Sequence, residues 1–408
     1  MKNALAKIRG IQIFRSFRHR NYRLLWGNNI ITLSGYWILV TAQGWLVLQL
    51  TDSAFWVGLI AFIMGIPALF LSPFGGVYAD RFDRRKLMLF GQGVSGLLIL
   101  LLATLTFTGV IAMWHIVAIA VLLGTVWALT DPALMAIIPS LVPPDDLMNA
   151  IAMNSISGRA SRSIGPAIAG VLMGLVAVGG AFYGAGIAFM VGLLLLFSMR
   201  LPKMVIARRA SMGKTMGEGL RYIRSNTITL TLILMSACVS LFALPYFWLM
   251  PVFARDVLGV GEAGYSQLMM VTGVGGLGGA LAAAILGDFK RKGWLLIGSA
   301  LIFTITLIIF ATSKSFPLAL VLSIIIGGAN GLFYAVTVVL LLSMVPDQFR
   351  GRVMGVYAIT WYLPAIGSLV LGAATDWIGL PVALVTGALI CTVFILGVTL
   401  RLPALRRF

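Results

Sequence analysis

The stretch that decides the fold reads Pro-Phe-Gly-Gly-Val-Tyr-Ala-Asp-Arg-Phe-Asp-Arg-Arg-Lys-Leu and runs from Pro73 to Leu87. On each side of this short polar segment stand more than twenty residues that are almost wholly apolar. Apolar runs of that length are typical of helices that cross a membrane. The segment is therefore predicted to be a tight loop at one membrane face, with an aspartate at a helix end and a cluster of cations beside it.

The composition extends this interpretation to the whole chain. Of the 408 residues, 60% are hydrophobic and 10% are charged, whereas soluble domains carry about 25% charged residues. Backbone groups in hydrocarbon must bond within their own segment, so only helices or a closed barrel can span a bilayer. Barrel strands alternate apolar and polar residues, but 193–197 and 320–326 do not alternate. An all-α polytopic membrane protein is expected.

The net charge of +18 is placed as in membrane proteins and not as in nucleic-acid-binding proteins. Nearly all Lys and Arg residues lie in short segments between apolar runs, which is the positive-inside pattern. Such cations face the cytoplasm and anionic lipid headgroups. The lipid bilayer is thus a predicted partner and nucleic acid is not. Cys238 and Cys391 lie in apolar runs and suggest small buried hydrophobes; neither a metal nor a cofactor is expected.

Twelve spans are predicted, at residues 24–50, 53–79, 86–108, 111–136, 147–176, 180–200, 227–254, 263–287, 294–312, 316–343, 351–375 and 380–400. Most cations fall in the loops after even-numbered spans, so those loops and both termini are predicted to be cytoplasmic. The basic first 23 residues are followed by a long span without a small-residue cleavage site, unlike a signal peptide. They are expected to be a retained cytoplasmic segment.

The longest polar connection divides the predicted spans into six and six. We expect a basic cytoplasmic lead (1–23), an N-terminal six-helix bundle (24–200), a cytoplasmic linker (201–226), a C-terminal six-helix bundle (227–400) and a cytoplasmic tail (401–408). Weak self-similarity supports this division, because the Ser-Leu-Val-Pro at 140–143 resembles the Ser-Met-Val-Pro at 343–346. Parallel halves with a site between them are a recurring plan in transporters.

The polar loop resembles the loop between helices two and three of the major facilitator superfamily, Gly-x-x-x-Asp-Arg-x-Gly-Arg-Arg/Lys. The matching residues are Gly76, Asp80, Arg81, Arg84 and Arg85. The chain departs from the family pattern at Asp83, where glycine is usual. The resemblance covers nearly the whole chain and implies the major facilitator fold, with two pseudo-symmetric six-helix bundles.

A second resemblance narrows the expected function. Predicted helix five is similar to the Gly-Pro-x-x-Gly-Gly element of antiporting exporters, through Gly158, Gly165, Pro166 and Gly170. Pro132-Ala133, the prolines at 139 and 143, Asn154-Ser155 and Gly351-Arg352 resemble exporters of the enterobactin and macrolide-efflux type. The family's usual arginine in helix four has no counterpart at 122–124.

The loop resemblance implies a latch that holds the two halves together when the cytoplasmic side is shut. Asp80 can accept backbone N–H bonds at the N-terminus of a neighbouring helix, and Arg84 can close a charge pair there. Arg81 and Arg85 serve either this latch or headgroup contacts, and Asp288 is its copy in the second half. The alternative is a solvated loop that only sets the topology.

Three charges fall inside predicted spans: Asp131, Arg159 and Arg162. Charges there cost at least about 2.5 kcal/mol each on insertion scales, so they indicate function by default. An acid beside an arginine can serve as a proton site that responds to opening and closing. A static buried ion pair and an anchor for an anionic substrate are the alternatives. The small residues of helix five either seal the cavity or merely pack helices closely.

Amides and aromatic side chains in the spans are candidates for the wall of a central cavity, which would suit bulky amphipathic compounds. The candidates are Asn28, Asn29, Trp37, Gln43, Tyr246, Asn330, Tyr357 and Trp361. Aromatic residues of the core or of the membrane edge show the same sequence pattern.

These observations and resemblances predict a monomeric secondary exporter in the inner membrane of a bacterium. It would move a drug, macrolide or siderophore-like small molecule by alternating access, in exchange for protons. An importer or lipid flippase of the same fold is the alternative, and a non-transporting scaffold is a third. No pattern for bond-making chemistry is present in the sequence, so an enzyme is not expected.

Overall fold

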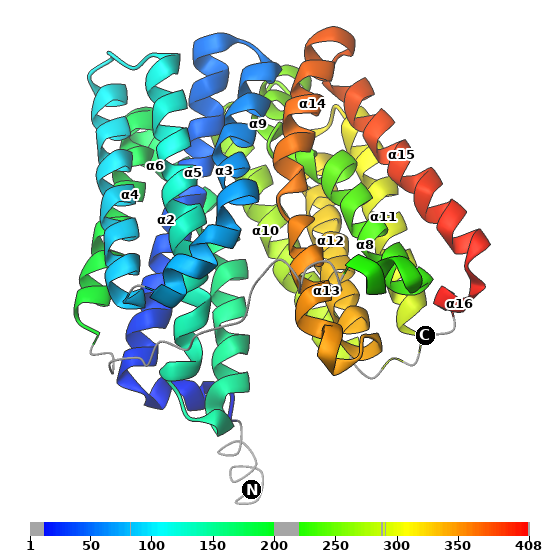
Figure 1. The fold of residues 1–408 in the computed structure, drawn as a ribbon. Coiled ribbons are helices and arrows are strands. Elements are labelled where there is room, and N and C mark those ends of the chain that lie inside the picture. The colour runs from blue at the N-terminus through cyan, green and yellow to red at the C-terminus, as the bar shows by residue number, and fades with distance from the viewer. Residues whose placement is uncertain (1–11, 82, 200–219, 287–288, 290, 407–408) are drawn as a thin grey trace, which may run out of the picture.

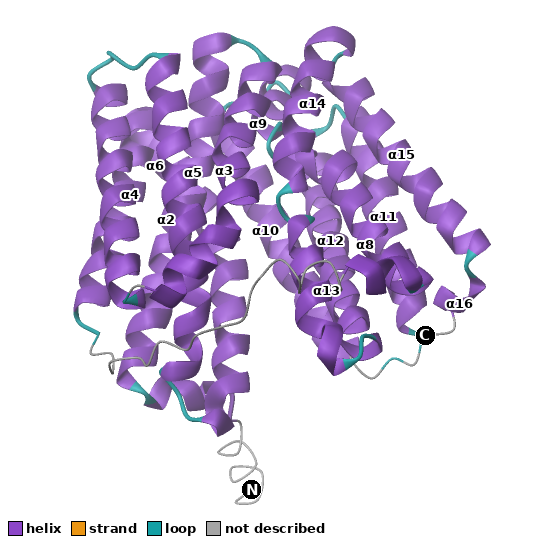
Figure 2. Cartoon of the chain, viewed as in Figure 1, coloured by secondary structure: helices purple, strands orange, loops and turns teal. Residues whose placement is uncertain are grey.

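The computed structural model describes residues 12–81, 83–199, 220–286, 289 and 291–406, with their side chains except at 12–13, 72–81, 135–136 and 404–405. The described residues form helices and connecting turns without a strand (Figure 2). Eleven helices are long and apolar enough to cross a membrane. The predicted all-α polytopic class is therefore confirmed. Most of the predicted linker lies outside the described residues.

The first half of the chain contains five long helices and two short 3-10 turns. They are η1 (Gln12–Arg18), α2 (Arg20–Thr51), α3 (Ala54–Arg81), α4 (Arg84–Phe107), α5 (Met113–Ile137), η2 (Ile138–Ser140) and α6 (Pro144–Phe197). Helix α4 starts where it does because Asp83 caps it, accepting bonds from the backbone N–H groups of Arg85 and Lys86.

Helix α6 contains two membrane crossings. It has 54 residues and would be about 81 Å long if straight, far more than a bilayer core of about 30 Å. Its backbone leaves helical geometry at Val176 and Ala177, and Ala177 has a φ of 59°. The chain reverses at this turn, as the packing of Leu172 against Gly184 shows. The two spans predicted at 147–176 and 180–200 are thus these two arms, and the chain crosses twelve times.

The second half of the chain contains more interruptions. Its helices are α8 (Thr227–Cys238), η3 (Val239–Ala243), η4 (Leu244–Phe247), α9 (Met250–Val252), η5 (Phe253–Val257), α10 (Glu262–Ile285), α11 (Lys292–Thr312), α12 (Phe316–Met344), α13 (Asp347–Ile359), α14 (Leu363–Ile378), α15 (Leu380–Arg401) and α16 (Pro403–Arg406). Spans predicted as continuous at 227–254 and 351–375 are broken near Pro245, Pro251 and Pro364, because proline lacks the N–H that an α-helix needs.

The helices form two bundles, α2–α6 and α8–α15, that touch at one end and diverge at the other (Figure 1). Helix α3 packs against α14, and α6 packs against α10. We call the end with α9 the closed end, and the end with α13 and α16 the open end. One buried hydrophobic core includes residues of both bundles. A second cluster at the open end, which includes Tyr22, Met88 and Leu196, belongs to the first bundle alone.

Candidate functional site

A carboxylate joins the two bundles at the closed end. Asp376, near the end of α14, accepts hydrogen bonds from the backbone N–H of Ala54 (3.1 Å) and of Phe55 (3.4 Å), and from the hydroxyl of Ser53 (2.8 Å). Helix α3 begins at Ala54, so Asp376 satisfies N–H groups that have no partner within the helix and meets the positive end of its dipole. The second bundle thus caps a helix of the first.

An ion pair crosses between the bundles at the same end. The Arg255 guanidinium lies 2.5 Å from a carboxylate oxygen of Asp52, and its Nε donates to Asp256 at 2.5 Å. Asp52 ends α2 in the left-handed region, with a φ of 50°, which turns its side chain out of the helix. Hydrogen bonding to Asp256, with a further bond to Asp52, raises the pKa of Arg255, so it stays charged. We call Asp52, Arg255 and Asp376 the closed-end latch.

Close backbone contact between α3 and α14 supports this latch. The hydroxyl of Ser368 donates to the carbonyl of Gly58 at 3.1 Å. A Cβ atom built on Gly65 would lie 2.5 Å from the Cβ of Ala365, which is closer than real Cβ contacts allow. Glycine at these positions therefore lets the two helices approach, and the closed end is sealed by packing as well as by charge.

A cavity of about 190 Å³ lies between the bundles near the middle of their helices. Helices α2 and α6 supply one wall, and η4, α10 and α12 supply the other. Its lining residues include Trp37, Arg159, Arg162, Tyr246, Thr272 and Asn330, together with glycines of α6, α10 and α12. The structure thus brings together six of the predicted site residues: Trp37, Gly158, Arg159, Arg162, Tyr246 and Asn330.

Arg162 occupies the boundary between the two bundles within this cavity. Its guanidinium carbon lies 5.0 Å from the ring centroid of Trp37 in the first bundle and 4.4 Å from that of Phe247 in the second. The two rings also meet edge to face, with centroids 5.5 Å apart. A cation over aromatic faces is held by their negative charge density. Phe247 directly follows the predicted Tyr246 in the chain.

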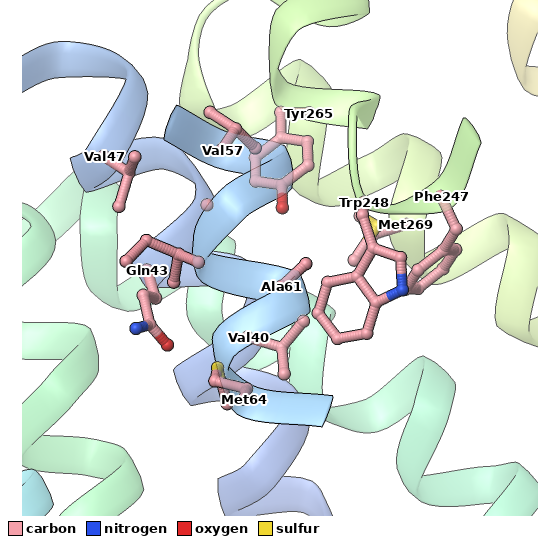
Figure 3. A pocket seen from close by; sticks show the side chains of 12 residues that line it. Val40, Gln43, Val47, Val57, Ala61, Met64, Phe247, Trp248, Tyr265 and Met269 are labelled. Atoms are coloured by element: carbon pink, nitrogen blue, oxygen red, sulfur yellow. The ribbon is translucent and has the colours of Figure 1, made fainter. Parts of the chain in front are cut away.

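Gln43 lies in a second, smaller pocket nearer the closed end (Figure 3). This pocket of about 20 Å³ is bordered by Trp248, Tyr265 and Met269 from the second bundle. Both amide atoms of Gln43 are buried and have no hydrogen-bond partner within the described chain. The volume is enough for about one water molecule, which would satisfy the amide. Gln43 is thus separate from the larger cavity.

Asp131 lies on the face of α5 that is turned toward α2. One turn earlier on the same face, the Trp127 ring packs on the Tyr36 ring with centroids 5.2 Å apart. The Tyr36 ring also packs on the Trp37 ring, with centroids 5.1 Å apart, and Arg162 lies over Trp37. Asp131 forms no ion pair with any residue that the structure describes, and its side chain is exposed. The static ion pair considered from the sequence is therefore not formed in this state.

Two predicted cavity residues are used inside the first bundle. Asn28 and Asn29 are buried, and Asn29 donates to the side-chain oxygen of Asn154 at 2.5 Å. Asn28 accepts a bond from Thr32 at 3.4 Å. Asn29 thus ties α2 to α6, Asn28 bonds within α2, and neither residue lines either pocket described above. Their placement supports a role in helix packing.

The two predicted aromatic residues near the break between α13 and α14 differ in environment. Tyr357 is 1% exposed, and Trp361 is 65% exposed. Their rings meet edge to face, with centroids 6.4 Å apart. Neither residue lines the 190 Å³ cavity.

The small residues predicted on helix five serve two different contacts. Gly165 faces α2 within the first bundle, whereas Gly170 faces α10 of the second bundle, where a Cβ would lie 2.6 Å from that of Ser266. Gly158 lines the cavity. Pro166 is buried, and the backbone stays helical there because the only non-helical residues of α6 are at the later turn. Gly170 thus lies on the seam between the bundles, and Gly165 does not.

Gly165 provides a stability test of the packing between α2 and α6. A Cβ at this position would overlap the Cβ of Trp37 and lie 2.7 Å from the carbonyl oxygen of Ser34. We expect Gly165→Val to destabilise the protein by about 1–3 kcal/mol, because overpacking forces helices apart, and to lower its melting temperature in detergent. Gly174→Val is the matched control, since nothing lies within 4 Å of that position. Equal melting temperatures would contradict this account.

The predicted latch at the open end is only partly visible. The side chains of Asp80 and Arg81, the surroundings of Gly76 and the whole of Asp288 lie outside what the structure describes. Arg85 donates to the carbonyl of Phe197 at 2.8 Å and so caps the last turn of α6. The Asp80 latch therefore stays a prediction.

An unpredicted contact holds the basic N-terminal segment. Asp146, buried in the first turn of α6, lies 2.5 Å from the Nε of Arg15 and 2.8 Å from the Nε2 of His19. An acid in the first turn of a helix also meets the positive end of its dipole. The sequence shows that Asp146 stands at the start of a helix, but it does not show that Arg15 and His19 contact it.

Comparison with known proteins agrees with this architecture. A family model described as transmembrane secretion effector matches residues 11–407. The staphyloferrin A transporter of Staphylococcus aureus is 23% identical over 88% of this chain and 90% of its own. The multidrug efflux pump Tap of Mycobacterium tuberculosis is 25% identical over 92% of both chains. Macrolide efflux protein A of Streptococcus pyogenes is 22% identical over 87% of this chain and 90% of its own.

A solved structure shows the same fold. A bacterial homologue of the human lysosomal transporter Spinster, crystallised in an inward-facing and unoccupied conformation, superposes with a TM-score of 0.76 at 14% sequence identity. The match covers 96% of this chain and 98% of that chain. The major facilitator fold predicted from the sequence is confirmed.

Proposed function

The chain belongs to the transmembrane secretion effector family of major facilitator transporters, and we propose that within this family it exports bulky amphipathic small molecules in exchange for protons. It is thus a multi-pass membrane transporter and not an enzyme. Drug-, macrolide- and siderophore-like compounds are the proposed substrates, as the names of its relatives suggest. Bacterial relatives support a place in the plasma membrane.

The observation that carries this proposal is a cavity between two bundles that is shut at one end only. The hydrogen bonds, ion pairs and ring contacts that join the bundles within the described chain lie from the cavity to the closed end. Toward the open end the bundles diverge (Figure 1). This arrangement is one of the two states that alternating access requires, and the Spinster homologue was solved in an inward-facing state.

The charge distribution orients the protein in this proposal. Arg84, Arg85 and Lys86 at the start of α4, and Arg350 and Arg352 in α13, lie at the open end. Because cations concentrate on the cytoplasmic side, the open end faces the cytoplasm and the cavity loads from there or from the inner leaflet. Both termini are then cytoplasmic.

Outward opening in this scheme exchanges one helix cap for another. In the present state, Asp376 at the end of α14 caps the start of α3. The proposed Asp80 latch places a carboxylate from the other end of α3 at the start of the helix pair α13–α14. Each state would therefore satisfy one helix N-terminus with a carboxylate from the opposite bundle, which keeps the energies of the two states close.

Coupling is assigned in this proposal to Asp131, with Arg162 and Arg159. Asp131 is the one described acid that lies more than a turn from a helix end. Asp131 lies one turn beyond Trp127, and a chain of ring contacts runs from Trp127 through Tyr36 to Trp37, over which Arg162 lies. A proton on Asp131 would therefore change the potential beside the cavity. Such a link lets proton entry favour release of the cargo.

Transport by the purified protein tests this function. In liposomes, we expect the protein to accumulate a lipophilic dye when a pH gradient is imposed, because proton flow drives the exchange. Accumulation is followed by dye fluorescence, with protein-free liposomes and a proton ionophore as controls. Dye movement that ignores the gradient would remove proton coupling, and no movement of any lipophilic dye or siderophore-like compound would count against export.

A further inference from the structure

We infer that the cavity binds an organic anion, whose oxyanion group lies on Arg162 and Asn330 and whose flat apolar part lies against Trp37 and Tyr246. This inference rests on the proposed transport function and names the chemical class of its substrate. It follows from the charges, the unpaired donors and the shape of the cavity wall.

The charge of the cavity is unbalanced. Arg159 and Arg162 lie three residues apart, on one face of α6, and both line the cavity. Neither forms an ion pair with any carboxylate that the structure describes. Removing an uncompensated cation from water inside a membrane is costly, and such charges pair with a partner or mark a substrate path. Because the protein supplies no carboxylate here, a bound anion is the partner that the site lacks.

Two hydrogen-bond donors in the cavity are unused. The Nε of Arg162 and the Nδ2 of Asn330 are shielded from solvent and lack a hydrogen-bond partner in the described structure. They come from opposite bundles, on α6 and α12. A buried donor without an acceptor costs free energy, so both positions favour a ligand with acceptor oxygens. Guanidinium groups bind carboxylate and phosphate oxygens with two parallel bonds, which suits an oxyanion best.

The remaining wall suits a flat apolar group. Trp37 and Tyr246 line the cavity with aromatic side chains, while Gly273, Gly276 and Gly327 face it without side chains. Aromatic faces and bare backbone make a smooth slot beside the cations. The volume of about 190 Å³ is large enough for an oxyanion with one or two fused rings.

A ligand in this cavity would contact both bundles at once. An anion on Arg162 and Asn330 would bridge α6 and α12. The ligand would therefore make different contacts in the present state and in a state where the bundles have moved apart. Such a difference is what allows a ligand to shift a conformational equilibrium.

The test compares two probes of the same shape. 1-Naphthoate carries a carboxylate, and 1-naphthamide is its neutral counterpart. We expect the detergent-solubilised full-length protein to bind naphthoate at least about tenfold more tightly than naphthamide, since a bond to a charged group contributes that much or more. Binding is followed by quenching of tryptophan fluorescence and by calorimetry. Equal affinity for the two probes overturns the inference.

Two substitutions separate binding from folding. Arg162→Gln should weaken naphthoate binding by about 10- to 100-fold and leave naphthamide binding unchanged. Without ligand, its melting temperature should stay equal or rise, because an unpaired buried charge is removed. Asn330→Asp should abolish naphthoate binding and raise the melting temperature, because the protein then supplies the missing carboxylate. Unchanged naphthoate affinity in both variants overturns the inference.

Failure of this inference can be told apart from failure of the proposed function. Binding in detergent requires neither a gradient nor transport. If lipophilic dyes are exported but the wild type does not discriminate between the naphthyl probes, the anion site is wrong and the exporter stands. If naphthoate binds selectively but no compound is transported, the site stands and the exporter is wrong.

Discussion

Asp131→Asn is expected to abolish accumulation that depends on a pH gradient. The amide has nearly the same shape as the carboxylate, but it cannot take up or release a proton. Uptake into liposomes driven by a proton gradient should fall to the level of protein-free liposomes. Exchange of labelled for unlabelled cargo at equal pH should continue, because it needs the movement of the bundles but no net proton transfer. The two assays on one preparation therefore separate coupling from transport.

Asp145→Asn is the matched control for this prediction. Asp145 is an exposed acid in the first turn of α6, away from the cavity. Its replacement should leave gradient-driven uptake unchanged. If Asp131→Asn still accumulates cargo as well as the wild type, Asp131 has no part in coupling. If the exchange at equal pH is also lost, the residue acts in binding or movement and the coupling assignment is wrong.

A covalent link across the closed end is expected to stop transport completely. Ser53 and Asp376 come from different bundles, and their side-chain oxygens are 2.8 Å apart. Replacing both with Cys places two thiols where a disulfide can form between α3 and α14. Oxidation should then reduce transport to background, since the cavity cannot open toward the closed end. A reducing agent should restore it. Transport is measured as dye movement before oxidation, after oxidation and after reduction.

The single variants identify what the link itself does. Ser53→Cys alone should be insensitive to the oxidant, which also controls for Cys238 and Cys391 in the second bundle. Asp376→Cys alone removes the cap of α3, which typically stabilises by about 1 kcal/mol, and should favour the outward-open state by about fivefold. Full transport by the oxidised double variant would show that this end does not open, and alternating access through it would be excluded.

Some of the candidate site followed from residue type alone. Arg159, Arg162 and Asp131 stood out because charge within a span is costly wherever the span lies. Trp37, Tyr246 and Asn330 are polar or aromatic residues in apolar spans, and all three line the cavity with the arginines. Asn28 and Asn29 have the same residue types in an equally apolar span, but they bond to Asn154 and Thr32 inside one bundle. Sequence pattern does not distinguish these two environments, because it does not show which face meets which helix.

Breaks in the helices were harder to foresee than the helices themselves. The spans at 227–254 and 351–375 contain prolines, but prolines also occur in α3 and α5 without an interruption of those helices. Whether proline ends a helix depends on whether neighbouring helices can satisfy the backbone groups that it leaves free. The outcome is therefore decided by packing.

The amino-acid sequence by itself determined the class, the crossings and the charge asymmetry of this protein, because the cost of placing each residue in lipid is set locally by its own chemistry and its near neighbours. Only the tertiary structure decided the closed-end latch and the composition of the cavity. Ser53 and Asp376 are 323 residues apart in the chain, and the donors of Arg162 and Asn330 come from different bundles. Contacts of that kind depend on how two rigid bundles pack, which no local pattern records.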